Sequence, residues 1–157
     1  MAVGKVTKYN QFESILFGTS YRQWDDATTG SVMWLLAKET YTPSLTHTTV
    51  ANIGTAGVDY ITIGSDGEPM AIAGRTIDAT TTPGTTYFKS SDANFGAAVS
   101  IVAKYLIAIH PVSANVFAST AKLLFYIDLD TSTTSSVVQS SSSAFVVNQP
   151  DYWWKTT

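Results

Sequence analysis

The chain contains no cysteine and has few charged residues. A disulfide framework, a thiolate zinc site and a cysteine nucleophile are therefore excluded, whereas either redox compartment suits the protein. Charged residues make up 13% of the 157 positions, which is about half of the roughly 25% usual in soluble domains. The net charge is −3 and no run of basic residues occurs, so we expect no direct binding to nucleic acid.

Long hydrophobic runs are also missing. The most apolar stretch, Ile101 to Ile109, is interrupted by Lys104 and is much shorter than the roughly 20 residues of a membrane span. Near the N-terminus, Asn10, Gln11 and Glu13 interrupt any signal-peptide core. We therefore expect a soluble protein that does not bind membranes. It should fold as one domain, because domains cluster near roughly 100–150 residues.

Serine and threonine are abundant instead. The 17 Ser and 23 Thr residues form about a quarter of the chain, so the surface must be rich in hydroxyl groups. Threonine favours pleated, half-buried positions, and Val, Ile, Tyr, Phe and Trp accompany it in most of the apolar runs. The composition therefore favours β structure, and the weakly charged exterior suits a protein that is largely covered by its neighbours.

Several apolar runs have the length of strands and are separated by Gly, Pro, Asp and Ser/Thr clusters, which is typical of an all-β sandwich or barrel. Two of them, Ile101 to Ile109 and Leu123 to Leu129, predict central strands. The remaining predicted strands are Ser31 to Lys38, Asp59 to Gly64 with Pro69 to Ala79 as its hairpin partner, Thr85 to Ser90, and Ala144 to Val147. The predicted fold is all-β, a β-sandwich or jelly-roll-like antiparallel domain with a possible short N-terminal helix.

The N-terminal segment has a different periodicity. Apolar residues recur at i, i+3, i+6 and i+7 between Tyr9 and Leu16, Asn10 is an acceptable N-cap, and Gly18 can end a helix. This pattern predicts a short amphipathic helix from about Gln11 to Phe17. A twisted strand is the alternative.

Aromatic residues gather at both ends of the chain. We divide the chain into an N-terminal arm or short helix (1–24), a β domain (25–148) and an aromatic C-terminal tail (149–157). Large rigid side chains are common interface anchors, but these residues could equally close the domain's own core. Both interpretations stay open for the first group, and an interface is favoured for the second. The candidate interface residues are Tyr9, Phe12, Phe17, Tyr21, Trp24, Tyr152, Trp153 and Trp154.

No group of residues shows a catalytic pattern. His47 lies in a Thr/Ser-rich loop and His110 ends an apolar run, so structural roles explain both better than catalysis. Asp128 and Asp130 begin like a calcium loop, but Thr133 stands where that loop requires glycine. No nucleophile elbow, phosphate-binding loop or zinc-protease motif occurs. We therefore expect no enzyme activity, no metal site and no cofactor.

Between about residues 20 and 130, several motifs follow one another in a fixed order. They are Trp24-Asp25-Asp26, the apolar run Ser31 to Ala37, Tyr41-Thr42-Pro43, the loop His47 to Ile53, and the two runs Ala103 to Ile109 and Leu123 to Leu129. This order resembles small virion proteins of tailed bacteriophages. That group includes capsid decoration, or cement, proteins and structural components of heads and tails, and the resemblance carries no catalytic residues.

The resemblance implies a structural virion protein, most simply a capsid cement protein on the outer surface of the phage head. Its partner would then be the major capsid protein of the shell. A homo-oligomer is expected, with a trimer favoured because shell sites in such phages often have threefold symmetry. The alternative is a tail-fibre or appendage module that binds a receptor or carbohydrate through exposed Trp and Tyr. Fibres more often show repeats or a coiled coil, and this chain has neither.

Overall fold

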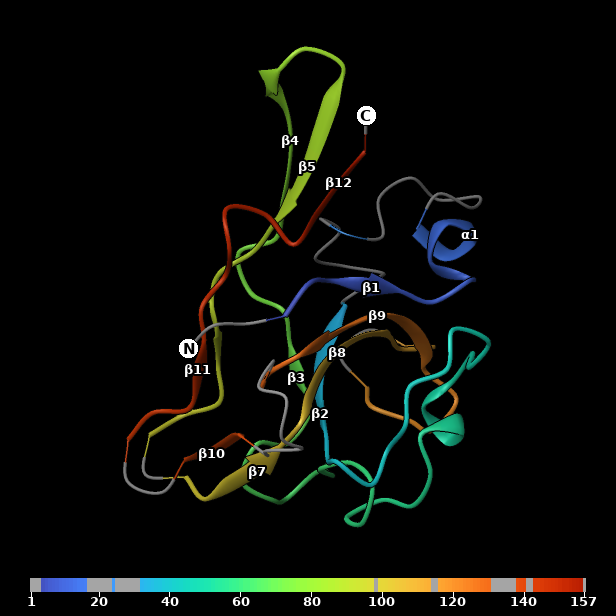
Figure 1. Cartoon of the computed structure of the whole chain (residues 1–157), viewed down its shortest axis with the longest axis vertical. Coiled ribbons are helices and arrows are strands. Elements are labelled where there is room, and N and C mark those ends of the chain that lie inside the picture. The colour runs from blue at the N-terminus through green and yellow to red at the C-terminus, as the bar shows by residue number, and fades with distance from the viewer. Residues whose placement is uncertain are drawn as a thin grey trace.

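A five-stranded antiparallel sheet, buried on both faces, forms the centre of the molecule (Figure 1). The computed structural model describes residues 4–16, 24, 32–97, 99–113, 116–130, 138–140 and 143–156. The order of strands in the central sheet is β1-β9-β8-β2-β3. These strands are β1 (Thr7–Lys8), β2 (Met33–Ala37), β3 (Met70–Ala71), β8 (Tyr105–His110) and β9 (Lys122–Asp128).

Three smaller antiparallel sheets surround this centre in the described part of the chain, with orders β10-β7, β11-β6 and β12-β5-β4. Their strands are β4 (Thr76–Thr82), β5 (Thr85–Lys89), β6 (Ala93–Asn94), β7 (Ile101–Ala103), β10 (Val138–Ser140), β11 (Val146–Val147) and β12 (Trp154–Thr156). The short helices are α1 (Phe12–Leu16) and the 3₁₀ turn η1 (Val50–Asn52). The predicted all-β antiparallel class and the N-terminal helix are both confirmed.

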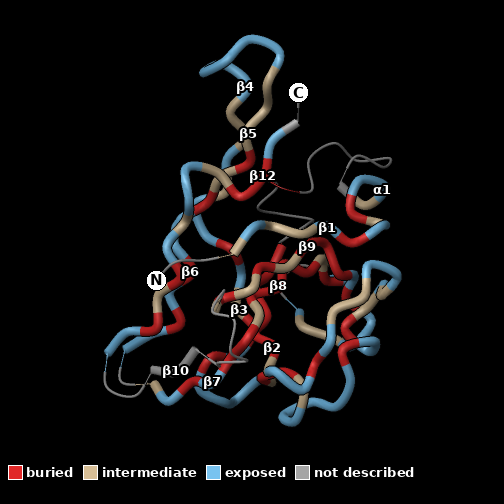
Figure 2. Tube along the Cα trace, in the orientation of Figure 1, coloured by how far each residue is buried: buried red, intermediate tan, exposed pale blue. Residues whose placement is uncertain are grey.

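Side chains alternate between the two faces of the central sheet. On β2, Trp34 and Leu36 enter one hydrophobic cluster, whereas Met33 and Leu35 enter another on the opposite face. The first cluster is closed by α1 and by side chains from β5, β6, β7, β11 and β12, and the second by the loops around η1. The buried trace in Figure 2 follows this centre. The layer that covers the first cluster is thus built from several small sheets rather than from one large sheet.

A β-bulge in β9 connects the N-terminal segment to the sheet. Ala108 pairs with Phe125 and Ile109 pairs with Leu123, so Leu124 is the extra residue. The backbone N–H of Tyr9 donates to the Leu124 carbonyl at 3.0 Å. This bond ends the β1 pairing and places Phe12 of α1 against the cluster that Leu124 and Phe125 share.

The predicted strand Asp59 to Gly64 is wrong. Only isolated bridges form at Tyr60, because this segment is folded into turns. The Asp59 carboxylate accepts the N–H of Thr55, and the glycine at each side, Gly57 and Gly64, has a positive φ. The segment 69–79 consequently pairs elsewhere: its first part is β3 beside β2, and β4 begins after Gly74.

The predicted strand Ile101 to Ile109 is divided into β7 and β8 at Lys104. The Lys104 side chain is only 11% exposed, and its ammonium lies 2.9 Å from Asp128 Oδ1 and donates to the Asp130 carbonyl at 2.7 Å. The Asp128 hydrogen bond is the main reason that the pKa of Lys104 is raised. The charge therefore joins the β7–β8 corner to the end of β9.

Replacing Lys104 with methionine is expected to cost about 1.5–3 kcal/mol of stability at neutral pH, because two charge-assisted hydrogen bonds disappear. A raised folded-state pKa stabilises the protein fully below the ordinary lysine value of 10.5, and this contribution is lost as pH rises through the folded value. Urea denaturation of both proteins at neutral and strongly alkaline pH measures the effect. If the difference in stability between the wild type and Lys104→Met is the same at alkaline pH as at neutral pH, the charge of Lys104 is not the source of the stabilisation.

None of the helices within the described residues has the length and apolar character to cross a membrane.

Candidate functional site

The structure buries most of the aromatic residues that the sequence assigned to an interface. Tyr9, Phe12, Trp24, Trp153 and Trp154 are at most 5% exposed within the single chain. They close the domain's own core, which is one of the two interpretations left open for Tyr9, Phe12 and Trp24. For Trp153 and Trp154, where an interface was favoured, this burial is a correction. Phe17 and Tyr21 lie outside the described residues, and Tyr152 is partly exposed.

Adjacent tryptophans at the C-terminal end occupy one cluster. Trp153 packs edge-on against Trp34 at a centroid distance of 4.9 Å, and its indole N–H donates to Ser90 Oγ at 2.7 Å. Trp154 stacks on Phe88 at 3.6 Å and meets Phe12 at 4.5 Å. Burial rather than docking therefore explains these two residues.

The N-terminal aromatics are held by similar contacts. The Trp24 indole N–H donates to the Lys89 carbonyl at 3.0 Å. The hydroxyl groups of Tyr9 and Tyr41 lie 2.8 Å apart, and the Tyr41 hydroxyl lies 3.1 Å from His47 Nδ1. Burial raises the pKa of both tyrosines. His47 thus has the loop hydrogen-bonding role that its position predicted.

Polar and aromatic side chains that reach solvent lie together on the outer face of the β12-β5-β4 sheet. Register pairs Asp78 with Tyr87 and Tyr87 with Lys155, which places the three side chains in one row. The Tyr87 and Tyr152 rings lie 5.2 Å apart at an interplanar angle of 53°. We call this surface the tyrosine face, and it comprises Asp78, Thr82, Tyr87, Lys89, Tyr152 and Lys155.

The Asp78 carboxylate holds the hairpin in shape. It accepts hydrogen bonds from the backbone N–H groups of Thr80 and Thr81 and from both threonine hydroxyls, and it pairs with Lys89 at 3.0 Å. These bonds, led by the Thr81 hydroxyl and then Lys89, hold the pKa of Asp78 well below its usual range. Because Asp78 is fully engaged, the remaining polar groups of the tyrosine face are mainly donors.

Acidification should loosen the β4–β5 hairpin only at a pH below the ordinary pKa of an aspartate. A lowered folded-state pKa contributes stability above the ordinary value of 3.8, and that contribution is lost only as pH falls through the lowered value. The amide resonances of Thr80 and Thr81 are therefore expected to stay constant down to about pH 4 and to shift below it. Asp78→Asn should shift them already at neutral pH, and unchanged amide resonances in that variant would refute the role of the carboxylate.

Both lysines of the tyrosine face lie over its rings. Lys89 Nζ is 5.7 Å from the Tyr87 centroid, and Lys155 Nζ is 5.6 Å from the Tyr152 centroid. Lys155 is exposed and forms no ion pair with any carboxylate in the described part of the chain. The surface therefore offers two aromatic rings and cationic donors to a partner.

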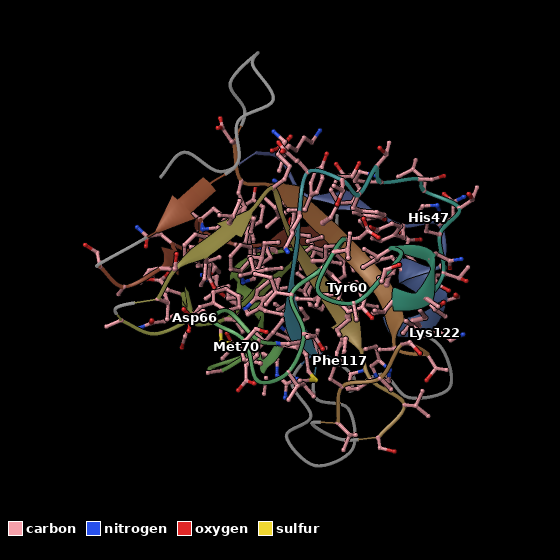
Figure 3. The ribbon with its side chains drawn as sticks, turned by 90° about the horizontal axis from the view of Figure 1, so that it is seen from below. His47, Tyr60, Asp66, Met70, Phe117 and Lys122 are labelled. Atoms are coloured by element: carbon pink, nitrogen blue, oxygen red, sulfur yellow. The ribbon has the colours of Figure 1, made fainter. Side chains whose placement is uncertain are left out.

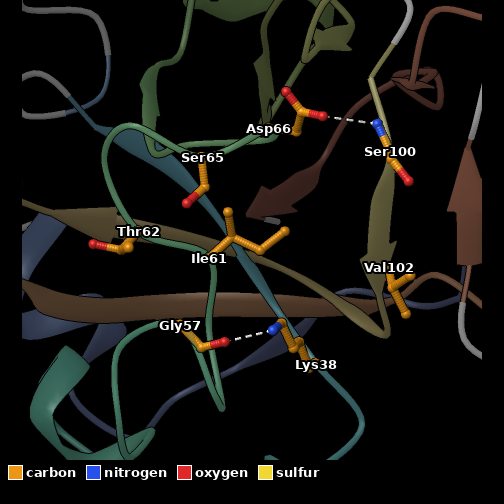
Figure 4. Close-up of a pocket in the computed structure, with 8 residues that line it drawn as sticks. All are labelled: Lys38, Gly57, Ile61, Thr62, Ser65, Asp66, Ser100 and Val102. Carbon is orange, nitrogen blue, oxygen red and sulfur yellow. Dashed lines mark hydrogen bonds between the residues drawn. The ribbon is translucent and has the colours of Figure 1, made fainter.

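A hollow of about 340 Å³ lies near the end of β2 (Figure 4). The Lys38 ammonium donates to the Gly57 carbonyl on one side, and on the other Asp66 Oδ2 accepts the N–H of Ser100 at 3.0 Å. Seen from below, Asp66 and Met70 lie near each other, away from His47 (Figure 3). Eight residues line this hollow: Lys38, Gly57, Ile61, Thr62, Ser65, Asp66, Ser100 and Val102.

The other polar candidates have structural partners. Asp128 pairs with Lys104, and Asp128 Oδ1 accepts the N–H of Asp130 at 3.0 Å. Burial, followed by the charge of Arg75, lowers the pKa of His110. Across the described ranges, no group of three or more His, Cys, Asp or Glu side chains is arranged to hold a metal ion.

Comparisons of the chain with protein-family models, with curated proteins and with solved structures find no match. The tyrosine face and the hollow therefore carry the functional argument through their own chemistry.

Sequence reasoning missed Tyr87, Lys89 and Lys155. The first two lie in the predicted strand Thr85 to Ser90, where alternation places Tyr87 and Lys89 opposite Phe88. That local signal could have identified a polar aromatic face. The contribution of Lys155 depends on the long-range pairing of β12 with β5, for which the sequence has no local signal.

Proposed function

We propose that this protein is a non-enzymatic structural component of a tailed-phage particle, most simply a capsid cement protein that attaches to the assembled head. The observation that supports this proposal is the β4–β5 hairpin, which projects from the body of the molecule (Figure 1). Its tip, residues 79–84, is exposed and uncharged, and β4 is an edge strand of its sheet. An open edge can pair with a strand of a neighbouring protein.

Attachment through such a hairpin suits a shell. Each contact would be small, but an oligomer that touches several capsid subunits at once gains effective concentration, so weak contacts add up to firm attachment. The hydroxyl-rich, weakly charged exterior is compatible with coverage by neighbours. The major capsid protein is the proposed partner, and a trimer is the proposed oligomer.

The location can be tested on particles from the source that carries the gene. Antibodies against the recombinant protein are expected to label the heads in immunogold electron microscopy, and quantitative mass spectrometry should find many copies per particle. Absence from purified particles would refute the proposal, and labelling of tails alone would refute the cement role.

Attachment can be tested by shortening the hairpin. Asp78 and Tyr87 are direct cross-strand partners, so an Asn-Gly turn can join them in place of residues 79–86. This variant is expected to lose co-sedimentation with shells that lack the protein, while thermal melting monitors the fold. Wild-type co-sedimentation of a folded variant would place attachment elsewhere.

The partly exposed Tyr87–Tyr152 pair favours a second candidate, binding of a carbohydrate or receptor by an appendage module, because sugar rings can stack on aromatic side chains. A glycan array separates the two functions. Saccharide binding that is lost in Tyr152→Ala, together with absence from heads, would support this alternative.

A further inference from the structure

The two ends of the molecule differ in charge and in apolar character. The tyrosine face belongs to the β12-β5-β4 sheet at the upper end of the longest axis in Figure 1. The hollow lies towards the opposite end, between the 57–66 loop and β7. Each surface also holds one charge of the opposite sign, but Lys38 of the hollow donates to the Gly57 carbonyl and Asp78 of the tyrosine face pairs with Lys89. The remaining charges of the two surfaces are complementary, which makes a second copy of this chain the candidate partner.

The upper end is aromatic and cationic. The tyrosine face has two lysines against one carboxylate, and Asp78 is already occupied by Lys89 and by the threonines beside it. Its rings are only partly buried, and Lys155 stands free of carboxylates within the described residues. This surface suits a partner that offers carboxylates beside apolar side chains.

The opposite end has that composition. Asp66 and Glu68 are exposed; one oxygen of each accepts a backbone N–H, from Ser100 and from Gly64, at 3.0 and 2.7 Å. Neither carboxylate pairs with a cation of the described chain.

Large apolar side chains are exposed in the segments of chain that form the same hollow. Val102 lines it, and Val58 and Ile63 are neighbours of the lining residues Gly57 and Thr62. Their exposed fractions are 41%, 56% and 60% respectively.

We infer that the tyrosine face of one copy docks on the hollow of a second copy, with Lys155 against Asp66 and Glu68, and with Tyr152 on the apolar side chains around Val102. Such a contact joins different surfaces, so the first copy keeps a free hollow and the second copy keeps a free tyrosine face. Contacts of this type close into a ring when the rotation between copies permits, and otherwise they extend as a chain.

The contact should be weak in free solution. Its charged pairs lie at exposed side chains, and an exposed ion pair typically contributes only about 0–1 kcal/mol. Association is therefore expected to depend on protein concentration and on salt, because part of the attraction is between exposed charges.

Charge reversal with the full chain provides the test. Sedimentation velocity from micromolar to near-millimolar concentration should show reversible association of the wild type, and Lys155→Glu or Asp66→Lys alone should weaken it about tenfold or more. An equimolar mixture of the two variants should restore association, because each then supplies the surface that the other has lost.

Lys122→Glu provides the matched control, since it reverses an exposed lysine outside both surfaces and should leave association unchanged. Asp66→Lys loses the hydrogen bond to Ser100, so Asp66→Asn, which retains an oxygen acceptor, provides a second variant that should also weaken association. A wild type that stays monomeric, single reversals without effect, or a mixture that fails to recover would each overturn the inference.

This inference does not depend on attachment to a phage shell. A protein that self-associates as described but is missing from particles would leave the inference standing and remove the proposed function. Conversely, a monomer that labels phage heads would remove the inference and the proposed trimer and leave the cement role standing.

Discussion

Replacing Trp153 with alanine is expected to lower the free energy of unfolding by about 3–5 kcal/mol, the usual cost of truncating a fully buried tryptophan. Trp153 is 2% exposed, packs against Trp34 and hydrogen-bonds to Ser90 through its indole N–H. The change removes these contacts and leaves a cavity between the central sheet and β12. Equilibrium denaturation in urea measures the loss.

Tyr152→Ala is the matched comparison. Its ring is partly exposed and contacts Tyr87 on the surface, so the cost should stay below about 1 kcal/mol. If both variants have the same stability as the wild type, Trp153 does not close the core.

Gly67→Ala is expected to cost about 2–5 kcal/mol through two separate effects. Gly67 has a φ of +79°, where an L-residue is strained by roughly 1–2 kcal/mol. A Cβ atom there would also lie 2.9 Å from Ile101 Cδ1 and 3.1 Å from Leu36 Cδ1, and both of these side chains are fully buried. Overpacking of this kind adds roughly 1–3 kcal/mol.

Gly84→Ala separates the two effects. Gly84 has nearly the same φ, +78°, but an added Cβ would have no atom within 4 Å. Only the backbone strain of roughly 1–2 kcal/mol should remain. Equal losses of stability in the two variants, measured by the same denaturation experiment, would show that the space around Gly67 can adjust.

The sequence predicted the strands whose side chains are apolar on both faces. β2, β8 and β9 lie in the centre of the sheet, where burial of Leu35, Ile107 and Leu124 outweighs local irregularity. The strand predicted at 59–64 was wrong, although the alternation of Tyr60, Ile61 and Thr62 is typical of a strand. There, glycines with positive φ and the Asp59 side chain form turns instead.

The candidate surfaces were less predictable than the fold. Tyr152 was identified because it stands beside two tryptophans, yet those tryptophans are buried and only Tyr152 contributes to the tyrosine face. Which neighbour of a pair faces solvent depends on the register of β12 against β5. Residues far apart in the sequence set that register, so a local pattern cannot reveal it.

The pairing of β1 with β9 also sets the order of events during synthesis. Thr7 pairs with Tyr126, so about 119 residues must emerge from the ribosome before the first strand finds its place. At about 5–20 residues per second, the interval is roughly 6–24 s. Until then Phe12 lacks both of its ring partners, Phe125 and Trp154, and Tyr9 has Tyr41 but lacks Tyr126. Contacts between such distant segments form slowly. The growing chain therefore carries uncovered aromatic side chains through most of its translation, the period in which a chaperone would protect it best.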